Sequence, residues 1–331
     1  MRSTCFDPNC TLLPSTSMNP FAQPGEWLRC QLHCHTTASD GTPTPAELVA
    51  HYAAAGCDVL AITDHWLITT FDTEAPLLIP ASELSARLAV PPFEVDVLAY
   101  GIQSLPEPRK QFPSIEACTQ WIVDNGGVAF LAHPYWSTLR REDYVMGVGL
   151  AGLEVWNGGC EVLQGSGLSD TFWDDLLQSG LRPFAIATDD AHDAGSAEGS
   201  DSGLGWTMVR VQERTCAAVI EALRTGAFYA TTGPELLDIS IEDGQTTVRT
   251  SPAHSITLRS GAWDGGRVNA NPELPTYRGE VLERSTDGGI IAARFEAPEF
   301  WNWGRIEMIG MEGGRAWSNP YDYPEPTGTF S

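Results

Sequence analysis

The first two thirds of the chain alternate short apolar runs with longer segments that have the pattern of helices. Apolar runs of this length predict buried strands, and segments with a capping residue and a glycine stop predict helices. Such alternation predicts parallel strands joined by crossovers, and therefore an α/β fold. We expect strands at 27–35, 58–63, 77–82, 93–100, 128–132, 153–157, 183–188 and 206–211, and helices at 43–56, 114–127, 169–180 and 216–226.

The α/β pattern is best interpreted as a closed or nearly closed barrel, a distorted (β/α)7 version of the TIM type. An open doubly wound sheet is the alternative, but no glycine-rich phosphate loop follows the first expected strand. After Gly233 and Pro234 the pattern changes to alternating runs such as LLDISI and RIEMIGM, which predict a smaller C-terminal β-sandwich-like domain. The expected division is an N-terminal extension at 1–19, in which Met18 is a candidate start, the barrel at 20–235, and the β domain at 236–331.

Composition narrows the classes of partner. The chain has 19 Lys and Arg against 43 Asp and Glu, a formal net charge of −24, which argues against a nucleic acid polymer as a partner. A small anion held by metal ions stays compatible with this charge. The eight cysteines form no Cys-x-x-Cys pair, so we expect reduced thiols and a cytoplasmic protein. No apolar run reaches the roughly 18 residues of a membrane span, and residues 1–20 lack a signal-peptide pattern.

Candidate chemistry follows from the places of the histidines. Only seven occur, and five of them come at or just beyond the end of an expected strand: His33, His35, His65, His133 and His192. Two carboxylates, Glu83 and Asp190, end further strands in the same sense, and a third, Asp40, follows His35 in a loop rich in Thr, Ser and Gly that can fold back toward the pair. In a parallel barrel these strand ends converge on one rim, where active sites lie. The two other histidines, His51 and His254, are expected on the surface.

These residue types predict a metal site. Imidazole together with carboxylate suits Zn, Mn, Fe or Co. Three ligands serve one catalytic ion, so eight candidates predict two or three divalent ions that share bridging ligands. Glu83 is the natural bridge, because its two oxygens can bind different ions.

The motifs resemble, in order, those of the PHP family, the polymerase and histidinol phosphatase metal-dependent phosphoesterases. They are HCHTTASDG at 33–41, TDH at 63–65, a strand ending in Glu83, AHP at 132–134 and the Asp-x-His of 190–192. The resemblance covers roughly residues 20–235. GAFYATTGPEL at 226–236 and RIEMIGMEGGRAWSNP at 305–320 further resemble the CehA/McbA-type metallohydrolase branch, more loosely, and bring in Tyr229 and Thr232 as weaker candidates.

The resemblance implies a distribution of ligands among the ions. His33, His35, Glu83 and Asp190 would hold the first ion, and Glu83 would bridge to a second ion completed by His133. Asp40, His65 and His192 would hold a third ion in a trinuclear site. Where the family often has a histidine after the bridging glutamate, this chain has Asp96. Asp96 is either an oxygen ligand to the second ion or the mark of a missing ligand.

The resemblance and the ligand set together imply hydrolysis of a small organic phosphate mono- or diester by a hydroxide shared between the ions. Asp190, or Asp189 beside it, would take the proton, and His65 or His192 would protonate the leaving group if not ligating. Asp64 is expected to be a structural partner. Candidates for binding substrate are Arg140, Arg141, Arg87, Asn157 and the pair Tyr135 and Trp136, which either stack on a ring or plug the barrel mouth.

Two other functions stay open. The first is hydrolysis of a carbamate, ester or amide at the same site, because a bridging hydroxide attacks carbon as readily as phosphorus and few basic residues surround the rim. The second is a non-catalytic module whose metals are structural. The oligomeric state and the identity of the metal do not follow from the sequence.

Overall fold

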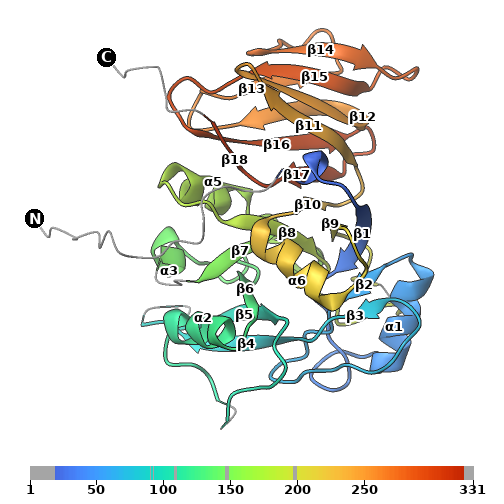
Figure 1. The fold of residues 1–331 in the computed structure, drawn as a ribbon, viewed down its shortest axis with the longest axis vertical. Helices are drawn as coiled ribbons and strands as arrows, with labels where there is room; N and C mark the ends of the chain where they lie inside the picture. Colours follow the sequence, from blue (N-terminus) through green and yellow to red (C-terminus); the bar gives the residue numbers. More distant parts are fainter. Residues whose placement is uncertain are drawn as a thin grey trace, which may run out of the picture.

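The computed structural model describes residues 19–89, 91, 93–107, 110–145, 149–196 and 200–323. These residues form a mixed α/β structure, in which a β-rich C-terminal part stands above an α/β part in the view of Figure 1. Apart from Asn19, the expected N-terminal extension lies outside the described residues, as do Cys5, Cys10 and the candidate start Met18.

The α/β part follows the predicted order of elements closely. Its strands are β1 (Glu26–Gln31), β2 (Val59–Leu60), β3 (Leu77–Leu78), β4 (Ala81–Arg87), β5 (Glu94–Tyr100), β6 (Val128–Leu131), β7 (Leu150–Asn157), β8 (Phe184–Thr188), β9 (Trp206–Val211) and β10 (Phe228–Thr231). Its helices are η1 (Pro20–Ala22), α1 (Pro45–Ala54), α2 (Ile115–Asp124), α3 (Arg141–Val145), α4 (Gly158–Gln164), α5 (Asp170–Gln178) and α6 (Cys216–Thr225). The sequence did not predict α3, α4 or β10.

The strands form two sheets that meet at isolated bridges. One sheet has five strands in the order β4-β5-β6-β7-β8, and the other has thirteen, among them the path β10-β9-β1-β2-β3. Single parallel bridges join the segments beyond the strand ends, Cys34 with Ala191 and His65 with Glu83. The all-parallel expectation is wrong for β5, which is antiparallel to both β4 and β6, and for β9, which is antiparallel to β1. The short loop between β4 and β5 forces a hairpin, because a parallel crossover needs a dozen or more residues.

Two expected strand ends also differ from the structure. β1 stops at Gln31, so His33 and His35 stand in the extended segment beyond it. The single strand expected at 77–82 is divided at Pro80, which has no N–H to donate, and a new strand begins at Ala81. Glu83 is therefore the third residue of β4 and not a strand end. It still reaches the level of His65, because the Glu83 N–H donates to the Thr63 carbonyl just beyond β2 (3.0 Å).

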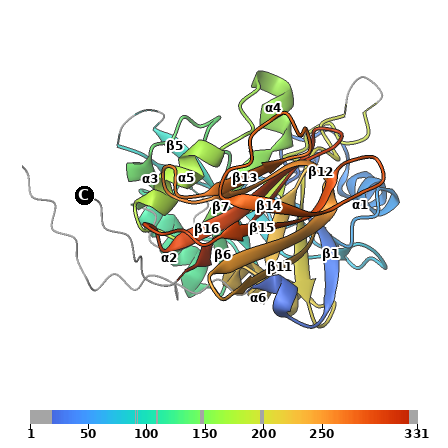
Figure 2. The ribbon, with the colours of Figure 1, turned by 90° about the horizontal axis from the view of Figure 1, so that it is seen from above.

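The C-terminal part is antiparallel β structure. It contains β11 (Leu236–Glu242), β12 (Gln245–Arg259), β13 (Gly266–Asn269), β14 (Gly279–Arg284), β15 (Ile290–Glu296), β16 (Trp303–Gly310), β17 (Arg315–Ser318) and β18 (Tyr321–Asp322). The first half of β12 pairs with β11 and β15, and its second half with β13 and β16. Seen from above in Figure 2, these strands lie in front of the α/β part. β17 pairs with β10, so the sheet crosses the expected division at 235/236 without a break; that division stays a prediction.

One arginine joins the two parts. Arg305 on β16 is fully buried, and its guanidinium binds the Asp174 carboxylate of α5 through two nitrogens (2.9 and 2.7 Å). It also lies 4.5 Å from the centre of the Trp173 ring and 3.4 Å from Glu307. A buried guanidinium needs this set of acceptors, because an unpaired charge is costly to bury.

The helices begin where the sequence supplies caps. Thr44 and Glu47 form a reciprocal capping box at the start of α1, with Pro45 as its first residue. Ser114 and Thr215 cap α2 and α6 in the same sense, each accepting a bond from a backbone N–H. Among the residues that the structure describes, none of the helices has both the length and the apolar character needed to cross a bilayer.

Candidate metal centre

Two buried imidazoles form the floor of the site. His33 and His35 follow the end of β1, and both are inaccessible to solvent. Backbone hydrogen bonds fix this segment against the end of β8, since Asp190 N–H donates to the His33 carbonyl (2.9 Å) and His35 N–H to the Ala191 carbonyl (2.8 Å). The Nε2 atoms of the two histidines lie 3.1 Å apart. As alternate residues of an extended segment, they present both nitrogens to the same point.

Glu83 connects this pair to a second group of donors. Its Oε2 lies 3.2 Å from both His33 Nε2 and His35 Nε2, while its Oε1 lies 3.3 Å from His133 Nε2. Asp190 Oδ1 lies 3.1 Å from His33 Nε2 and 3.3 Å from His35 Nε2. Two imidazole nitrogens and two carboxylate oxygens therefore converge on one point. The other oxygen of Glu83 lies next to His133.

A third group is nearer to solvent. Asp40 Oδ1 lies 3.3 Å from His35 Nδ1, and Asp40 Oδ2 lies 3.5 Å from His65 Nε2 and 3.6 Å from His192 Nε2. His65 Nδ1 is also 3.5 Å from Glu83 Oε2. The His65 and His192 side chains are about a third exposed, at 39% and 36%. This group therefore forms the open side of the centre.

Asp96 completes the group around His133. The ligand atoms of Glu83, Asp96 and His133 all lie within 4.8 Å of one another. Burial, together with the charge of Glu83, raises the pKa of Asp96 to about 7. An acid in this position is kept partly neutral by the carboxylate next to it, and a cation between them would remove that repulsion. Asp96 therefore lies where an oxygen ligand to a second ion would lie, and its role as a ligand stays a prediction.

The neighbouring carboxylates favour the charged form of the three buried histidines, His33, His35 and His133. Burial disfavours the charged form of His133, but its hydrogen bond to Glu83 and the charge of that carboxylate outweigh burial and raise its pKa to about 9. Burial opposes charge at His33 and His35 too, yet the neighbouring carboxylates raise both pKa values well above the usual range. Such a cluster holds protons where it would otherwise hold cations, because ligation requires neutral imidazole.

Two of the donors sit on strained backbone. His133 has φ of 28° and Asp190 has φ of 54°, a region that residues other than glycine seldom adopt. Each stands two residues beyond the end of a buried strand, His133 after β6 and Asp190 after β8. Strain of this kind costs on the order of 1–3 kcal/mol and concentrates at functional sites.

Sequence reasoning missed Glu154, which the structure places behind the donors. This carboxylate lies in the middle of β7 and is 1% exposed. Its Oε1 accepts from His33 Nδ1 (2.8 Å) and from the Thr188 hydroxyl, and its Oε2 accepts from His133 N–H (2.7 Å) and Asn157 Nδ2 (2.8 Å). A carboxylate within an apolar strand run was the available signal, since a buried charge must be paired.

Two further aspartates support the backbone and do not face the donors. Asp64 accepts from Thr36 N–H (2.8 Å) and from the hydroxyls of Thr36, Ser39 and Thr69, so it holds the loop that carries Asp40. This is the structural role expected for it.

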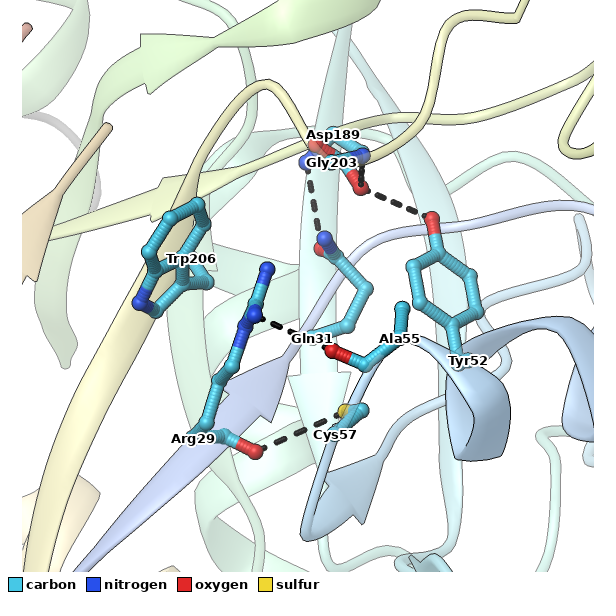
Figure 3. Close-up of a pocket in the computed structure, with 8 residues that line it drawn as sticks. All are labelled: Arg29, Gln31, Tyr52, Ala55, Cys57, Asp189, Gly203 and Trp206. Atoms are coloured by element: carbon cyan, nitrogen blue, oxygen red, sulfur yellow. Dashed lines mark hydrogen bonds between the residues drawn. The ribbon is translucent and has the colours of Figure 1, made fainter. Parts of the chain in front are cut away.

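Asp189 points the other way, into the small pocket of Figure 3. Its oxygens accept from the Tyr52 hydroxyl and from the backbone N–H groups of residues 203–205. The pocket, with Arg29 stacked on Trp206 (3.8 Å), has a volume of about 10 Å³, room for at most one water molecule. We therefore assign Asp189 a structural role and leave Asp190 as the carboxylate that faces the centre.

The candidates for binding substrate fall into two groups. Trp136 is 43% exposed, and its ring lies 5.1 Å from that of His133 in an edge-on arrangement, so it stands beside the donors together with exposed Tyr135. Asn157 is buried, and its amide donates to Glu154 and to Asp190 Oδ2 (3.1 Å), so it orders a donor.

The three arginines expected to bind substrate, Arg87, Arg140 and Arg141, do not bond to the donor set in the described residues. Arg141 pairs with Glu142 and Asp175, Arg87 bonds Gln111, and the Arg140 side chain is exposed. Within the described residues, no hydrogen bond or ion pair joins these side chains to the donor set, and their role toward substrate stays a prediction. Tyr229 is buried against Phe21 and Trp27, and the Thr232 hydroxyl bonds the Arg315 backbone, so both belong to the packing of the C-terminal part.

Comparisons with known proteins give short or distant similarities. No family model matches the chain. A 5'-3' exoribonuclease from Haemophilus influenzae is 54% identical over 41 residues, which is 12% of this chain and only 15% of the length of that protein. A two-domain protein containing a predicted PHP-like metal-dependent phosphoesterase, from Bacteroides vulgatus, has a TM-score of 0.48 and 16% identity, over 96% of this chain and 99% of that chain.

Two further solved structures have a TM-score of 0.38 and 18% identity each. One is an amidohydrolase from Chromobacterium violaceum with bound sulfate and no metal, over 50% of this chain and 88% of that chain. The other is a proposed metal-dependent phosphoesterase from Bifidobacterium adolescentis, and the similarity covers 59% of this chain and 96% of that chain. None of the three is named for the CehA/McbA-type branch, which stays a prediction. Of these solved structures, one is described as containing a predicted PHP-like metal-dependent phosphoesterase and one as a metal-dependent phosphoesterase.

Proposed function

We propose that this chain is a PHP-type, metal-dependent hydrolase that cleaves a small organic phosphate mono- or diester. The observation that carries the proposal is the position of Glu83, whose two oxygens belong to two different donor groups, one with His33 and His35 and one with His133. A carboxylate with this placement suits two ions that share it. We further infer that the two sheets, joined at their isolated bridges, form the distorted (β/α)7 barrel.

The donor set fits divalent transition metal ions. Buried imidazole nitrogens and carboxylate oxygens lie 3.1–3.3 Å apart around one point, the mixture that suits Zn, Mn or Fe. His33, His35, Glu83 and Asp190 would hold one ion, and Glu83, Asp96 and His133 a second. The group of Asp40, His65 and His192 would hold a third. When bound, such ions acidify water and neutralise charge that develops on the substrate.

The chain's own residues then have distinct tasks. Asp190, with one oxygen on the histidine pair and the other bonded by Asn157, is positioned to take a proton from the attacking water. His65 and His192 are on the open side, where either can protonate a leaving group if it is not ligating. Trp136, whose ring packs edge-on against His133, would form part of the wall beside a bound substrate.

A second candidate is hydrolysis of a carbamate, ester or amide at the same centre. It is favoured by the surroundings of the arginines, because Arg141 faces two carboxylates and Arg87 faces an amide. A phosphate dianion usually needs a free guanidinium or its equivalent nearby. The metal ions themselves can supply that charge, so we keep the phosphoester as the first proposal.

The test uses the full chain, stripped with a chelator and reloaded with Zn, Mn or Fe. Initial rates are measured on p-nitrophenyl phosphate, bis-p-nitrophenyl phosphate, p-nitrophenyl acetate and an aryl carbamate. We expect metal-dependent turnover of one of the phosphates, at least 100-fold lower in Glu83→Gln, with Glu161→Gln as a matched control that retains activity. Turnover of the acyl substrates alone would favour the second candidate. Metal binding without any turnover would favour a non-catalytic module.

A further inference from the structure

The C-terminal part contains a groove that is separate from the donor set. It lies where β12 ends and β13 begins and has a volume of about 190 Å³. Figure 1 shows both strands in the upper, β-rich part of the molecule. Its lining includes the polar residues Thr257, Arg259, Ser260 and Arg267 and the aromatic residues Trp263 and Tyr277. This volume is smaller than the roughly 300 Å³ at which pockets for drug-sized ligands begin, so it suits a single ring with one substituent.

The aromatic walls of the groove are exposed but held in place. The Trp263 side chain is 55% exposed and that of Tyr277 is 49% exposed, which is unusual for large aromatic residues. Trp263 packs edge-on against Phe300 with ring centres 4.8 Å apart, and the Tyr277 hydroxyl donates to the Trp263 carbonyl (3.1 Å). The backbones of Arg267 and Tyr277 exchange two hydrogen bonds, of 2.7 and 2.9 Å. Flat surfaces fixed in this way lose little entropy on binding a ring.

Arg267 is a cation without an acidic partner among the described residues. Its guanidinium bonds only neutral oxygens, those of Ser255 (2.9 Å), Asn269 (3.2 Å) and Thr257 (3.4 Å). These bonds orient the guanidinium and leave its charge uncompensated. Arg29, Arg87, Arg210 and Arg284 also bond only neutral oxygens, so what distinguishes Arg267 is its place in the groove together with the exposed rings of Trp263 and Tyr277.

The other arginine of the groove is different. Arg259 pairs with Glu307, which also binds Arg305 and Arg315, and the acids Asp170 and Asp174 of α5 act on it as well. Its charge is therefore nearly balanced. Arg267 is the group that an incoming anion would meet.

We propose that this groove binds a small organic anion that carries one flat ring. Its acidic group pairs with the guanidinium of Arg267, whose planar donors match the oxygens of a carboxylate or phosphonate. Its ring stacks on Trp263 and Tyr277. None of these residues belongs to the donor set, so the groove is a second site, and its ligand need not be the substrate.

The test is titration calorimetry, with ligand-observed NMR, on the full metal-loaded chain. Phenylphosphonate and benzoate, which resist hydrolysis, are the probes; methylphosphonate lacks the ring and benzamide lacks the charge. We expect the two aromatic anions to bind at least tenfold more tightly than either comparison compound. The better-bound of the two identifies the acidic group.

Variants connect that binding to the groove. Arg267→Gln and Trp263→Ala should each weaken binding at least tenfold and leave hydrolysis at the metal centre unchanged. Arg249→Gln, an exposed arginine paired with Glu283, is the matched control. If Trp263→Ala lowers the melting temperature, the binding test rests on Arg267→Gln alone. That substitution keeps the backbone hydrogen bonds between residue 267 and Tyr277. The proposal is overturned if benzamide binds as well as phenylphosphonate, or if Arg267→Gln binds with wild-type affinity.

Discussion

Glu154 offers a sharp test of the proposed centre, because it touches the ligands and not the metals. The substitution Glu154→Gln keeps the size of the side chain and replaces one oxygen by an NH2 group. The two ends of Glu154 have different partners: His33 Nδ1 and the Thr188 hydroxyl at Oε1, and His133 N–H and the Asn157 amide at Oε2. The structure determines which end the NH2 group will take.

The NH2 group cannot occupy the Oε2 end. The backbone N–H of His133 is an obligatory donor, and Asn157 cannot turn its amide, because its Oδ1 accepts from Cys160 N–H (2.9 Å). The glutamine oxygen must therefore face these two donors. Its NH2 group then faces His33 Nδ1, which has to become an acceptor, while the Thr188 hydroxyl rotates. Neutral His33 would then carry its proton on Nε2, the nitrogen that faces the other donors, and could not ligate.

The expected cost can be stated as an affinity. Loss of a partner that orients a ligating histidine typically weakens metal binding 10- to 100-fold, about 1.4–2.8 kcal/mol. We expect Glu154→Gln to fall in this range for the tightest-bound ion. The measurement is competition with a chromophoric chelator at pH 7.5, and nitrogen-15 NMR of the imidazoles should report a proton moved to Nε2 of His33.

Glu161→Gln is the matched control, since Glu161 is on the adjacent helix α4 and accepts only from Gly167 N–H among described contacts, a bond that glutamine keeps. Metal affinity within twofold of the wild type in Glu154→Gln, with the melting temperature preserved, would refute the reasoning. It would mean that His33 does not ligate through Nε2.

Four further expectations follow from the same contacts. His33→Ala should abolish turnover while circular dichroism shows the fold retained; near-normal activity would contradict the assignment. Asp96→Asn should lower the bound metal by about one ion per chain in elemental analysis, and Asp96→His should restore it; equal metal content in all three proteins would remove Asp96 from the centre. The pKa values of His133 and Asp96, about 9 and about 7, mean that both hold protons in metal-free protein below those values. Metal affinity should therefore rise with pH from 6 to 9, with proton release on metal addition at pH 7, and a flat affinity profile would exclude this linkage. Arg305→Met should lower the free energy of unfolding by about 3 kcal/mol in urea titrations, because it leaves Asp174 unpaired and removes the stacking on Trp173, whereas exposed Arg249→Met should change it by less than about 0.5 kcal/mol.

The candidate donors could be picked out from the sequence because most of them follow a strand end, which is a local feature. A buried strand, a turn and a histidine can be read within ten residues, and crossover connections bring such ends to one edge. Every predicted ligand, from His33 to His192, has a ligand atom in one of the clustered groups. The order of the strands was harder. Antiparallel β5 and the division at Pro80 depend on a short hairpin and on one missing N–H, neither of which alters the apolar pattern.

What the sequence could not predict are contacts between distant residues. Glu154 is 121 residues from His33, and only the fold makes one the partner of the other. Its carboxylate was visible as an acid in an apolar run, but a run of that kind gives no indication of which charge compensates it.

Asp96 is the opposite case: the sequence singled out this residue, but the pattern alone could not decide its role. By pattern, an aspartate in place of the expected histidine is either a lost ligand or a changed one. The structure puts its oxygen within reach of Glu83 and His133, in a position where burial and a neighbouring carboxylate raise its pKa. A charged carboxylate is costly to bury without a partner, and a cation bound next to it would offset that cost. Asp96 is half-buried beside Glu83 and His133, where a bound cation would remove the repulsion between the two carboxylates, and this supports our proposal that Asp96 is an oxygen ligand.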